Sequence, residues 1–165
     1  MYIISACLTG ENCKYDGGNN YNGSVCQFTK EHNCIMICPE MDGGLPSPRP
    51  PAEQVRIFGE NETDEEDEAC RAGKEKYPVK VVNKKGQDVT EAFYRGARRS
   101  LEKAQAEAER LGEDIEGAIL RANSPTCGSG MIYDGTFSKV LTEGDGIFAK
   151  MLKELGIPVE VTTAD

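Results

Sequence analysis

Two short apolar runs separated by a helical segment constrain the fold of this chain more than any other feature. Tyr2 to Ala6 and Ile35 to Ile37 are apolar and rich in β-branched residues, a composition typical of buried strands. Between them, Ser24 is predicted to cap a helix that continues to about His32. A strand-helix-strand unit favours a parallel pair, so the carboxyl ends of both strands should lie at the same edge of a sheet.

The rest of the chain continues this alternation. Small and apolar side chains repeat at helical spacing after Asp88 and stop at Gly112, which predicts one long helix. We therefore expect an α/β fold: a single domain over residues 1–165, with a mostly parallel, Rossmann-like sheet flanked by helices and a site at the carboxyl ends of its strands. The other expected elements are strands over 79–82, 115–122 and 159–161 and a final helix capped by Asp145 and closed by Gly156.

Charge and hydropathy exclude several classes of protein. The formal net charge of -9 argues against a broad electrostatic contact with nucleic acid or with an anionic membrane. No apolar run approaches the roughly 20 residues of a membrane span, and Met1 to Ile4 lacks the basic start of a signal peptide. We therefore expect a cytoplasmic protein with no membrane partner. The acidic run 60–68 cannot build a core and is predicted to belong to a solvated loop insertion near 59–76.

Cysteine is the residue type that points to chemistry, because the chain has seven cysteines and one histidine. A reducing cytoplasm disfavours structural disulfides, so metal or redox chemistry is the favoured explanation for so many thiols. The odd count and the lack of matched Cys-x-x-Cys pairs argue against a closed zinc ribbon. The single His32 argues against a His-rich metal site or a Ser-His triad. Thiolates, carboxylates and hydroxyls would have to carry any catalysis.

Cys7, Cys38 and Cys127 each lie at or just after a predicted strand end. Because parallel strand ends meet at one edge of a sheet, these thiols could share a site that no short motif reveals. Soft thiolates suit iron–sulfur chemistry, and three ligands without a fourth favour a cluster with one open iron. Glu40 and Ser124 lie within three residues of two of these cysteines and could reach a molecule bound there.

The segment that follows Cys38 is predicted to be a stiff loop. Gly43 and Gly44 allow backbone conformations that other residues resist. Four prolines then fix φ between residues 46 and 51. A loop of this kind would hold the side chains near Cys38 in position.

The cysteines also have plainer interpretations. Cysteine is among the residues most often buried, so any one of the seven can be a small core side chain, and Cys26 and Cys34 fit that description best. Cys70, beside the acidic run, is predicted to be exposed and incidental. Cys13 could be a fourth ligand, a reserve thiol or neither.

The polar candidates have alternatives as well. Glu40 could cap a helix or pair with Arg49, and Ser124 before a proline could be a turn residue. The arginines at 95, 98 and 99 are interpreted as a solvent-exposed helix face, with a phosphate site as the alternative.

Three groups of residues resemble the signature blocks of a known family. Together they cover nearly the first third of the chain and the region from 119 to about 137. On these blocks the chain is similar to the thiouracil desulfidase family, many members of which were long known only as a domain of unknown function. The blocks are Ser5 to Gly10 with Lys14 to Gly17, Cys38 to Glu40 with Gly43 to Pro46 and Pro48 to Glu53, and Ser124 to Gly128.

The resemblance implies a 4Fe-4S cluster with one iron that the protein does not ligate. Its ligands would be Cys7, Cys38 and Cys127, and the catalytic residues would be Glu40 and Ser124. The implied reaction is the non-redox desulfuration of a small thiolated pyrimidine such as 2-thiouracil, giving the oxo base and sulfide. The open iron would act as a Lewis acid, Glu40 would activate water, and Ser124 would orient the substrate or relay a proton.

The resemblance also bears on partners. Longer relatives carry a second domain and act on thiolated tRNA; we expect no such domain here, so a free thiolated nucleobase is the expected partner and nucleic acid is not. The family form has a lysine in the segment leading into Ser124, where this chain has Arg121, Ala122 and Asn123, so a contact on the substrate side is expected to differ. The rival hypotheses are a non-catalytic iron–sulfur or metal-binding module, such as a sulfide carrier or sensor, and an ordinary domain with buried thiols. The sequence leaves the oligomeric state open.

Overall fold

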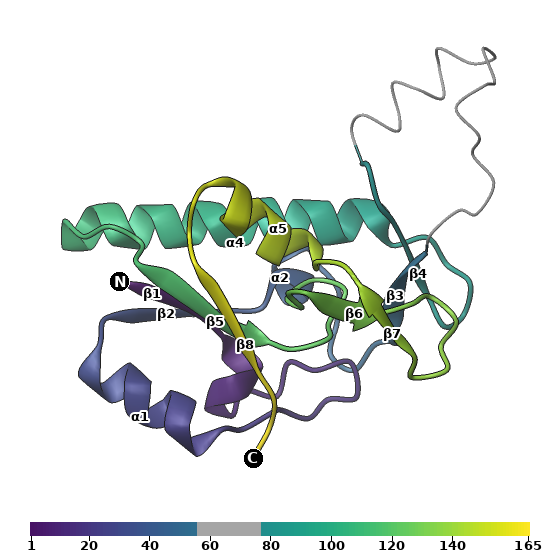
Figure 1. Ribbon diagram of the computed structural model, residues 1–165, viewed down its shortest axis with the longest axis horizontal. Helices are drawn as coiled ribbons and strands as arrows, with labels where there is room; N and C mark the ends of the chain where they lie inside the picture. The colour runs from purple at the N-terminus through teal and green to yellow at the C-terminus, as the bar shows by residue number, and fades with distance from the viewer. Residues whose placement is uncertain (56–76) are drawn as a thin grey trace, which may run out of the picture.

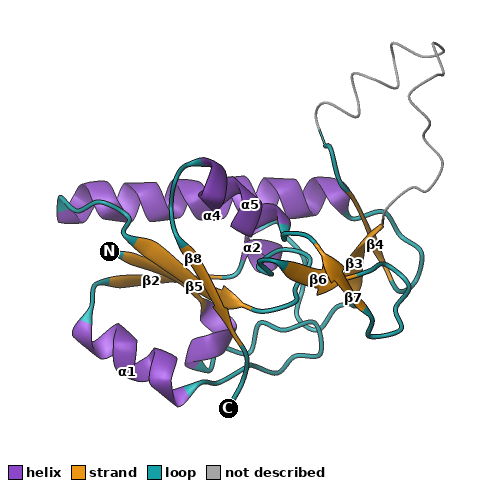
Figure 2. Cartoon of the chain, in the orientation of Figure 1, coloured by secondary structure: helices purple, strands orange, loops and turns teal. Residues whose placement is uncertain are grey.

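The computed structural model describes residues 1–55 and 77–165. The predicted acidic insertion near 59–76 and Cys70 lie outside the described residues. A central sheet lies between helix α1 (Gly23–Glu31) and the long helix α4 (Thr90–Leu111), as the ribbon and the secondary-structure colouring both show (Figures 1 and 2). Within the two described ranges, no helix combines the length and apolarity that crossing a bilayer requires.

The central sheet has four parallel strands in the order β2-β1-β5-β8. β1 pairs with β2 and β5, and β5 pairs with β8. This arrangement confirms the predicted α/β fold with a parallel sheet flanked by helices. The strands are β1 (Tyr2–Ser5), β2 (Cys34–Ile37), β5 (Gly117–Arg121) and β8 (Val159–Thr162).

Alternate residues of the central strands fill two cores, one on each face of the sheet. Ile3 packs in the same cluster as Phe93 of α4 and Phe148 of α5 (Ile147–Glu154). Its neighbour Ile4 packs with Val25 of α1. Successive side chains on a strand point to opposite faces, and both faces are covered here, which explains the continuous apolar runs in the sequence.

Two short antiparallel pairs accompany the parallel sheet. β3 (Ala52–Val55) pairs with β4 (Lys80–Asn83), and β6 (Met131–Tyr133) pairs with β7 (Leu141–Glu143). Only β4 was expected from the sequence. β3 is half polar and β6 and β7 have three residues each, so their periodicity is too short to be recognised.

Two predicted helix caps are wrong. α1 begins after Asn22, whose side chain accepts a 3.0 Å hydrogen bond from the N–H three residues on, so Ser24 lies inside the helix. α5 has no side-chain cap, because Asp145 Oδ1 accepts the N–H of Gly130 at 2.9 Å instead. Asp88 does contact the first turn of α4, since its Oδ1 accepts a 2.9 Å hydrogen bond from the first N–H of that helix.

A single helical turn, α2 (Pro39–Asp42), occupies the start of the segment predicted to be a loop, and it packs tightly on α4. A Cβ on Gly43 or Gly96 would collide with backbone of the facing helix, so this approach requires glycine. Arg95 of α4 donates two hydrogen bonds, at 3.1 and 2.6 Å, to the carbonyl oxygen of Gly43. The interpretation of a solvent-exposed arginine face is confirmed for Arg98 and Arg99. It holds only in part for Arg95, whose side chain is 38% exposed but binds the Gly43 carbonyl.

Candidate functional site

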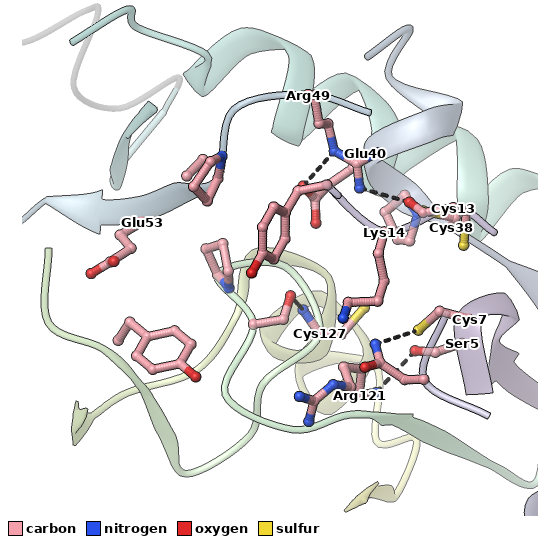
Figure 3. A pocket seen from close by; sticks show the side chains of 18 of the residues that line it. Ser5, Cys7, Cys13, Lys14, Cys38, Glu40, Arg49, Glu53, Arg121 and Cys127 are labelled. Atoms are coloured by element: carbon pink, nitrogen blue, oxygen red, sulfur yellow. Dashed lines mark hydrogen bonds and ion pairs between the residues drawn. The ribbon is translucent and has the colours of Figure 1, made fainter. Parts of the chain in front are cut away.

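A cavity of about 330 Å³ lies at the carboxyl edge of the parallel sheet (Figure 3). The last residues of three strands line it: Ser5 of β1, Ile37 of β2 and Arg121 of β5. Ligand sites of small molecules begin at about this volume. In parallel sheets this edge is where ligands bind, so the cavity is the candidate site of the protein.

All three cysteines that the sequence singled out line this cavity. Cys7 lies in the short 3-10 turn η1 (Ala6–Thr9) that follows β1, Cys38 directly follows β2, and Cys127 lies in the loop after β5. The three strands are neighbours in the sheet, so residues far apart in sequence meet at their ends.

Cys13 is a fourth thiol in the same cavity, and it is buried. Hydrogen bonds from its thiol to Cys38 and Cys7, together with burial, raise the pKa of Cys13. Cys38 Sγ also lies 3.9 Å from the Cys13 carbonyl oxygen. The raised pKa favours the protonated form of Cys13, whose single proton can be donated to either Cys7 or Cys38.

The same contacts favour the thiolate form of Cys7 and Cys38. The hydrogen bond from Cys13 lowers the pKa of Cys7 to about 7, helped by the Asn20 amide, whose Nδ2 donates to Cys7 Sγ at 3.4 Å. Cys13 also lowers the pKa of Cys38, and the backbone N–H of Met41 in α2 adds to this effect. Thiolates are the form of cysteine that binds metal.

Cys127 differs from the other two because its thiol is buried more deeply. Burial raises the pKa of Cys127 well above its usual value, and the negative charges of Cys7, Cys38 and Glu40 raise it further. Among residues 1–55 and 77–165, no three Cys, His, Asp or Glu side chains come close enough to enclose a single metal ion. A 4Fe-4S cluster is a different case, because it presents several iron atoms to its cysteine ligands.

Glu40 lies in the first turn of α2 and lines the cavity. Its Oε1 accepts a 3.1 Å hydrogen bond from Arg49 Nε, and its Oε2 accepts a 3.4 Å hydrogen bond from the Thr126 hydroxyl. Of the two alternatives for Glu40, capping is wrong, because α2 has no side-chain cap hydrogen bond. Pairing with Arg49 is confirmed. These contacts hold the carboxylate at the cavity wall.

Ser124 lines the cavity three residues before Cys127. Its Oγ accepts hydrogen bonds from the N–H groups of Thr126 and Cys127, each at 3.1 Å. Ser124 is therefore a turn residue that fixes the loop of Cys127. A hydroxyl has two acceptor lone pairs and one proton, so the Ser124 proton is still available to a bound molecule.

Comparison with known proteins places this chain in a family. The model of the 2-thiouracil desulfurase family matches residues 2–163. The chain belongs to the 2-thiouracil desulfurase family. The resemblance carried by the signature blocks is thereby confirmed.

Two relatives of this 2-thiouracil desulfurase family member are similar over nearly their whole length. YbbK of Bacillus subtilis (strain 168), described as an uncharacterized protein, is 35% identical over 159 residues, which are 96% of this chain and 93% of YbbK. TudS, a [4Fe-4S]-dependent thiouracil desulfidase of known structure, is 36% identical, with a TM-score of 0.70 over 97% of this chain and 89% of TudS.

Aromatic and basic side chains line the cavity of this 2-thiouracil desulfurase family member, beside the cysteines. Arg121 lines the cavity, and its positive charge also helps to lower the pKa of Cys7, behind the larger effects of Cys13 and Asn20. The other aromatic and basic residues of the wall are Tyr15, Tyr133, Phe137, Lys14, Arg49, Lys84 and Lys139.

The sequence pattern of this 2-thiouracil desulfurase family member did not identify several residues that shape the site. Asn20 contacts Cys7 from a loop rich in glycine and asparagine, where no periodicity marks one residue over another. Glu53 and Gln54 are polar residues on β3 with less than a tenth of their surface exposed. A buried polar residue must find partners, but the sequence does not reveal which residues of a short polar strand will be buried.

Proposed function

We propose that the chain is a 4Fe-4S-dependent desulfidase that converts a small thiolated pyrimidine, such as 2-thiouracil, into the oxo base. One water is consumed, the C=S bond is replaced by C=O, and sulfur leaves as hydrosulfide with a proton, so no electrons are gained or lost. The observation that carries the proposal is the meeting of Cys7, Cys38 and Cys127 with Glu40 and Ser124 around one cavity.

The donor set of the cavity fits an iron–sulfur cluster. Cys7, Cys38 and Cys127 would hold it and would leave one iron without a protein ligand. The lowered pKa of Cys7 and of Cys38, caused first by the Cys13 thiol, favours the ligand form of both residues. Burial raises the pKa of Cys127, but bound cations deprotonate the thiols that coordinate them. When bound, the cluster supplies a Lewis-acidic iron that polarises the carbon–sulfur bond.

Glu40 would act as the general base that takes a proton from the attacking water. Its Oε1 is held by the Arg49 guanidinium, which fixes the direction of the carboxylate. Its Oε2 has a single long contact, 3.4 Å from the Thr126 hydroxyl, and is therefore the oxygen free to accept a proton.

Ser124 would orient the substrate. Its two acceptor positions are taken by the N–H groups of Thr126 and Cys127, so the hydroxyl can only donate to a bound molecule. A ring nitrogen or carbonyl oxygen of a pyrimidine is a suitable acceptor. The small volume and the aromatic walls of the cavity, including Tyr15 and Tyr133, suit a single flat heterocycle.

The test is turnover by anaerobically reconstituted protein. We expect 2-thiouracil to give uracil and sulfide in equal amounts. Glu40→Gln should keep the cluster absorption and lose turnover by about 10²- to 10⁴-fold, the usual contribution of a general base. Glu102→Gln, an exposed glutamate on α4, is the matched control and should behave as the wild type.

A protein that binds the cluster fully but releases no sulfide from any thiolated pyrimidine would favour a non-catalytic carrier or sensor. Unchanged turnover in Glu40→Gln would remove Glu40 from the reaction.

A further inference from the structure

The loop between β6 and β7, residues 134–140, is held against the cavity by one carboxylate of β3. Glu53 Oε1 accepts hydrogen bonds from the N–H groups of Gly135 at 3.0 Å and Phe137 at 3.3 Å. Glu53 is only 7% exposed and lines the cavity itself. Figure 3 shows Glu53 across the cavity from Cys7 and Cys38. The carboxylate therefore joins the wall opposite the thiols to the loop.

This loop carries side chains that face the proposed substrate. Phe137 and Lys139 lie in the loop and Tyr133 is the last residue of β6, and all three line the cavity. They supply aromatic surface and one positive charge on the wall away from the cysteines. The position of the loop thus decides the shape of that wall.

The loop backbone is in a conformation that needs external support. Phe137 has φ 57° and Lys139 has φ 61°, a region that is uncommon for residues other than glycine. Such conformations persist where the surrounding structure holds them. Within the loop, the N–H and hydroxyl of Thr136 donate to Asp134 Oδ1 at 3.0 and 2.6 Å, the Ser138 hydroxyl donates to the Thr136 carbonyl at 3.2 Å, and Asp134 N–H donates to the Val140 carbonyl at 2.9 Å. The two hydrogen bonds to Glu53 are the ones that hold the loop on β3.

The loop also rests directly on the backbone of β3. A Cβ at Gly135 would lie 2.7 Å from the carbonyl oxygen of Gln54, and Gly135 has φ 93°. Glycine is therefore required at this contact. Both the carboxylate and the backbone of β3 set the position of residues 134–140.

We propose that Glu53 is a positioning residue for substrate binding: it fixes the loop 134–140 so that Phe137 and Lys139 complete the binding wall. This inference rests on the proposed function, because the molecule bound there would be the thiolated pyrimidine. Glu53 acts through the loop, and the reacting atoms are left to Glu40 and Ser124. A loss of binding that is equal in the ground state and transition state raises KM and leaves kcat unchanged.

The kinetic test uses the reconstituted holoenzyme and 2-thiouracil. Glu53→Ala should raise KM about tenfold and keep kcat within about twofold, the pattern of lost uniform binding. Glu53→Gln should restore most of the affinity, because its amide oxygen can still accept the two N–H groups. Glu102→Ala, which removes an exposed glutamate of α4, should match the wild type. A kcat that falls with an unchanged KM in Glu53→Ala would overturn the proposal.

A second measurement is independent of turnover. Hydrogen exchange of the peptide 134–140 should be about tenfold faster in Glu53→Ala, because two amides lose their acceptor. Uracil, the unreactive product, should slow this exchange in the wild type and have a weaker effect in Glu53→Ala. If the wild type releases no sulfide, the proposed function fails. The exchange rates do not depend on turnover, so they still decide whether Glu53 fixes the loop. Exchange that is equal in the wild type and Glu53→Ala would overturn that role.

Gly135→Ala provides a second variant in case Glu53→Ala does not fold. The added Cβ pushes the loop away from β3 and leaves the Glu53 side chain in place. We expect the same rise in KM and the same faster exchange. Wild-type values of both in Gly135→Ala would contradict the link between loop position and binding.

Discussion

Arg49 and Glu40 form an ion pair at the wall of the cavity, with Arg49 Nε 3.1 Å from Glu40 Oε1 and the Arg49 side chain only 5% exposed. The same guanidinium donates to the carbonyl oxygens of Cys13 at 2.9 Å and Pro46 at 3.0 Å. One buried side chain thus joins the proposed base to the loop that carries Cys13. Arginine can do this because its planar fork presents several donors in fixed directions.

Arg49→Lys should therefore impair catalysis although the charge is kept. The three donors of a lysine ammonium leave from one nitrogen and cannot span the three acceptors that the separate guanidinium nitrogens reach, so the Glu40 carboxylate loses its orientation. We expect kcat to fall by about 10- to 100-fold with the iron content unchanged, as for other residues that orient a catalytic group. Arg98→Lys, at an exposed position of α4, is the control. Wild-type sulfide release by Arg49→Lys would show that the ion pair does not position Glu40.

Ser124→Ala should lower both stability and turnover. The N–H groups of Thr126 and Cys127 lose their acceptor, which resembles the loss of a helix cap and costs about 0.5–2 kcal/mol in the free energy of unfolding. Ser124→Thr keeps a hydroxyl at this position and should retain most of both properties. Urea unfolding and the sulfide assay measure the two effects. Full turnover in Ser124→Ala would contradict a role for the hydroxyl with substrate.

Gln54→Leu should have a kinetic effect opposite to that of Glu53→Ala. Gln54 Nε2 donates to the carbonyl oxygens of Pro125 at 3.0 Å and Asp145 at 2.9 Å, so it fixes the residue next to Ser124. Leaving these two acceptors without the donor should cost about 1–3 kcal/mol in the free energy of unfolding. We expect a lower kcat with KM close to that of the wild type. A raised KM with unchanged kcat would mean that Gln54 and Glu53 act on the same wall.

Asp145 should make the start of α5 sensitive to acid. Partial burial by itself would raise the pKa of this carboxyl, but hydrogen bonds from Lys153 and the Gly130 N–H outweigh burial and lower it. The folded-state pKa of Asp145 is thus below the unfolded value of about 3.9. The ionised carboxylate therefore stabilises the folded protein fully above that value, and this stabilisation is lost as pH falls through the folded pKa. The urea midpoint of unfolding should be measured at neutral pH and below pH about 4. Its decrease between the two conditions should be smaller for Asp145→Asn than for the wild type. An equal fall in both proteins would exclude this contribution.

The residues of the site that could be predicted from the sequence are those at or near the ends of predicted strands. Short apolar runs located β1, β2 and β5, and parallel topology then brought Cys7, Cys38 and Cys127 to one edge. Glu40 and Ser124 followed because they are only two and three residues from Cys38 and Cys127. Local pattern and one topological rule made this grouping possible, and the resemblance to the thiouracil desulfidase family singled out these five residues.

The contacts that hold the site could not be predicted in the same way. Glu53 binds the N–H of Gly135, 82 residues further along the chain, and Gln54 binds the carbonyl of Pro125, 71 residues further along. Both depend on β3, which is too short and too polar to show a strand pattern. Cys13 and Asn20 reach Cys7 from an irregular loop. Tertiary packing selects such partners, and no local property of the sequence encodes them.

The central claim of this account is that the thiols of Cys7, Cys38 and Cys127 together hold one 4Fe-4S cluster. The most direct measurement is the iron and acid-labile sulfide content, with paramagnetic resonance spectra, of alanine variants reconstituted without oxygen. We predict about four iron atoms per chain in the wild type and in the Cys26→Ala control, and loss of most iron in each of the three ligand variants. A full iron content and an unchanged spectrum in Cys7→Ala, Cys38→Ala or Cys127→Ala would contradict the claim.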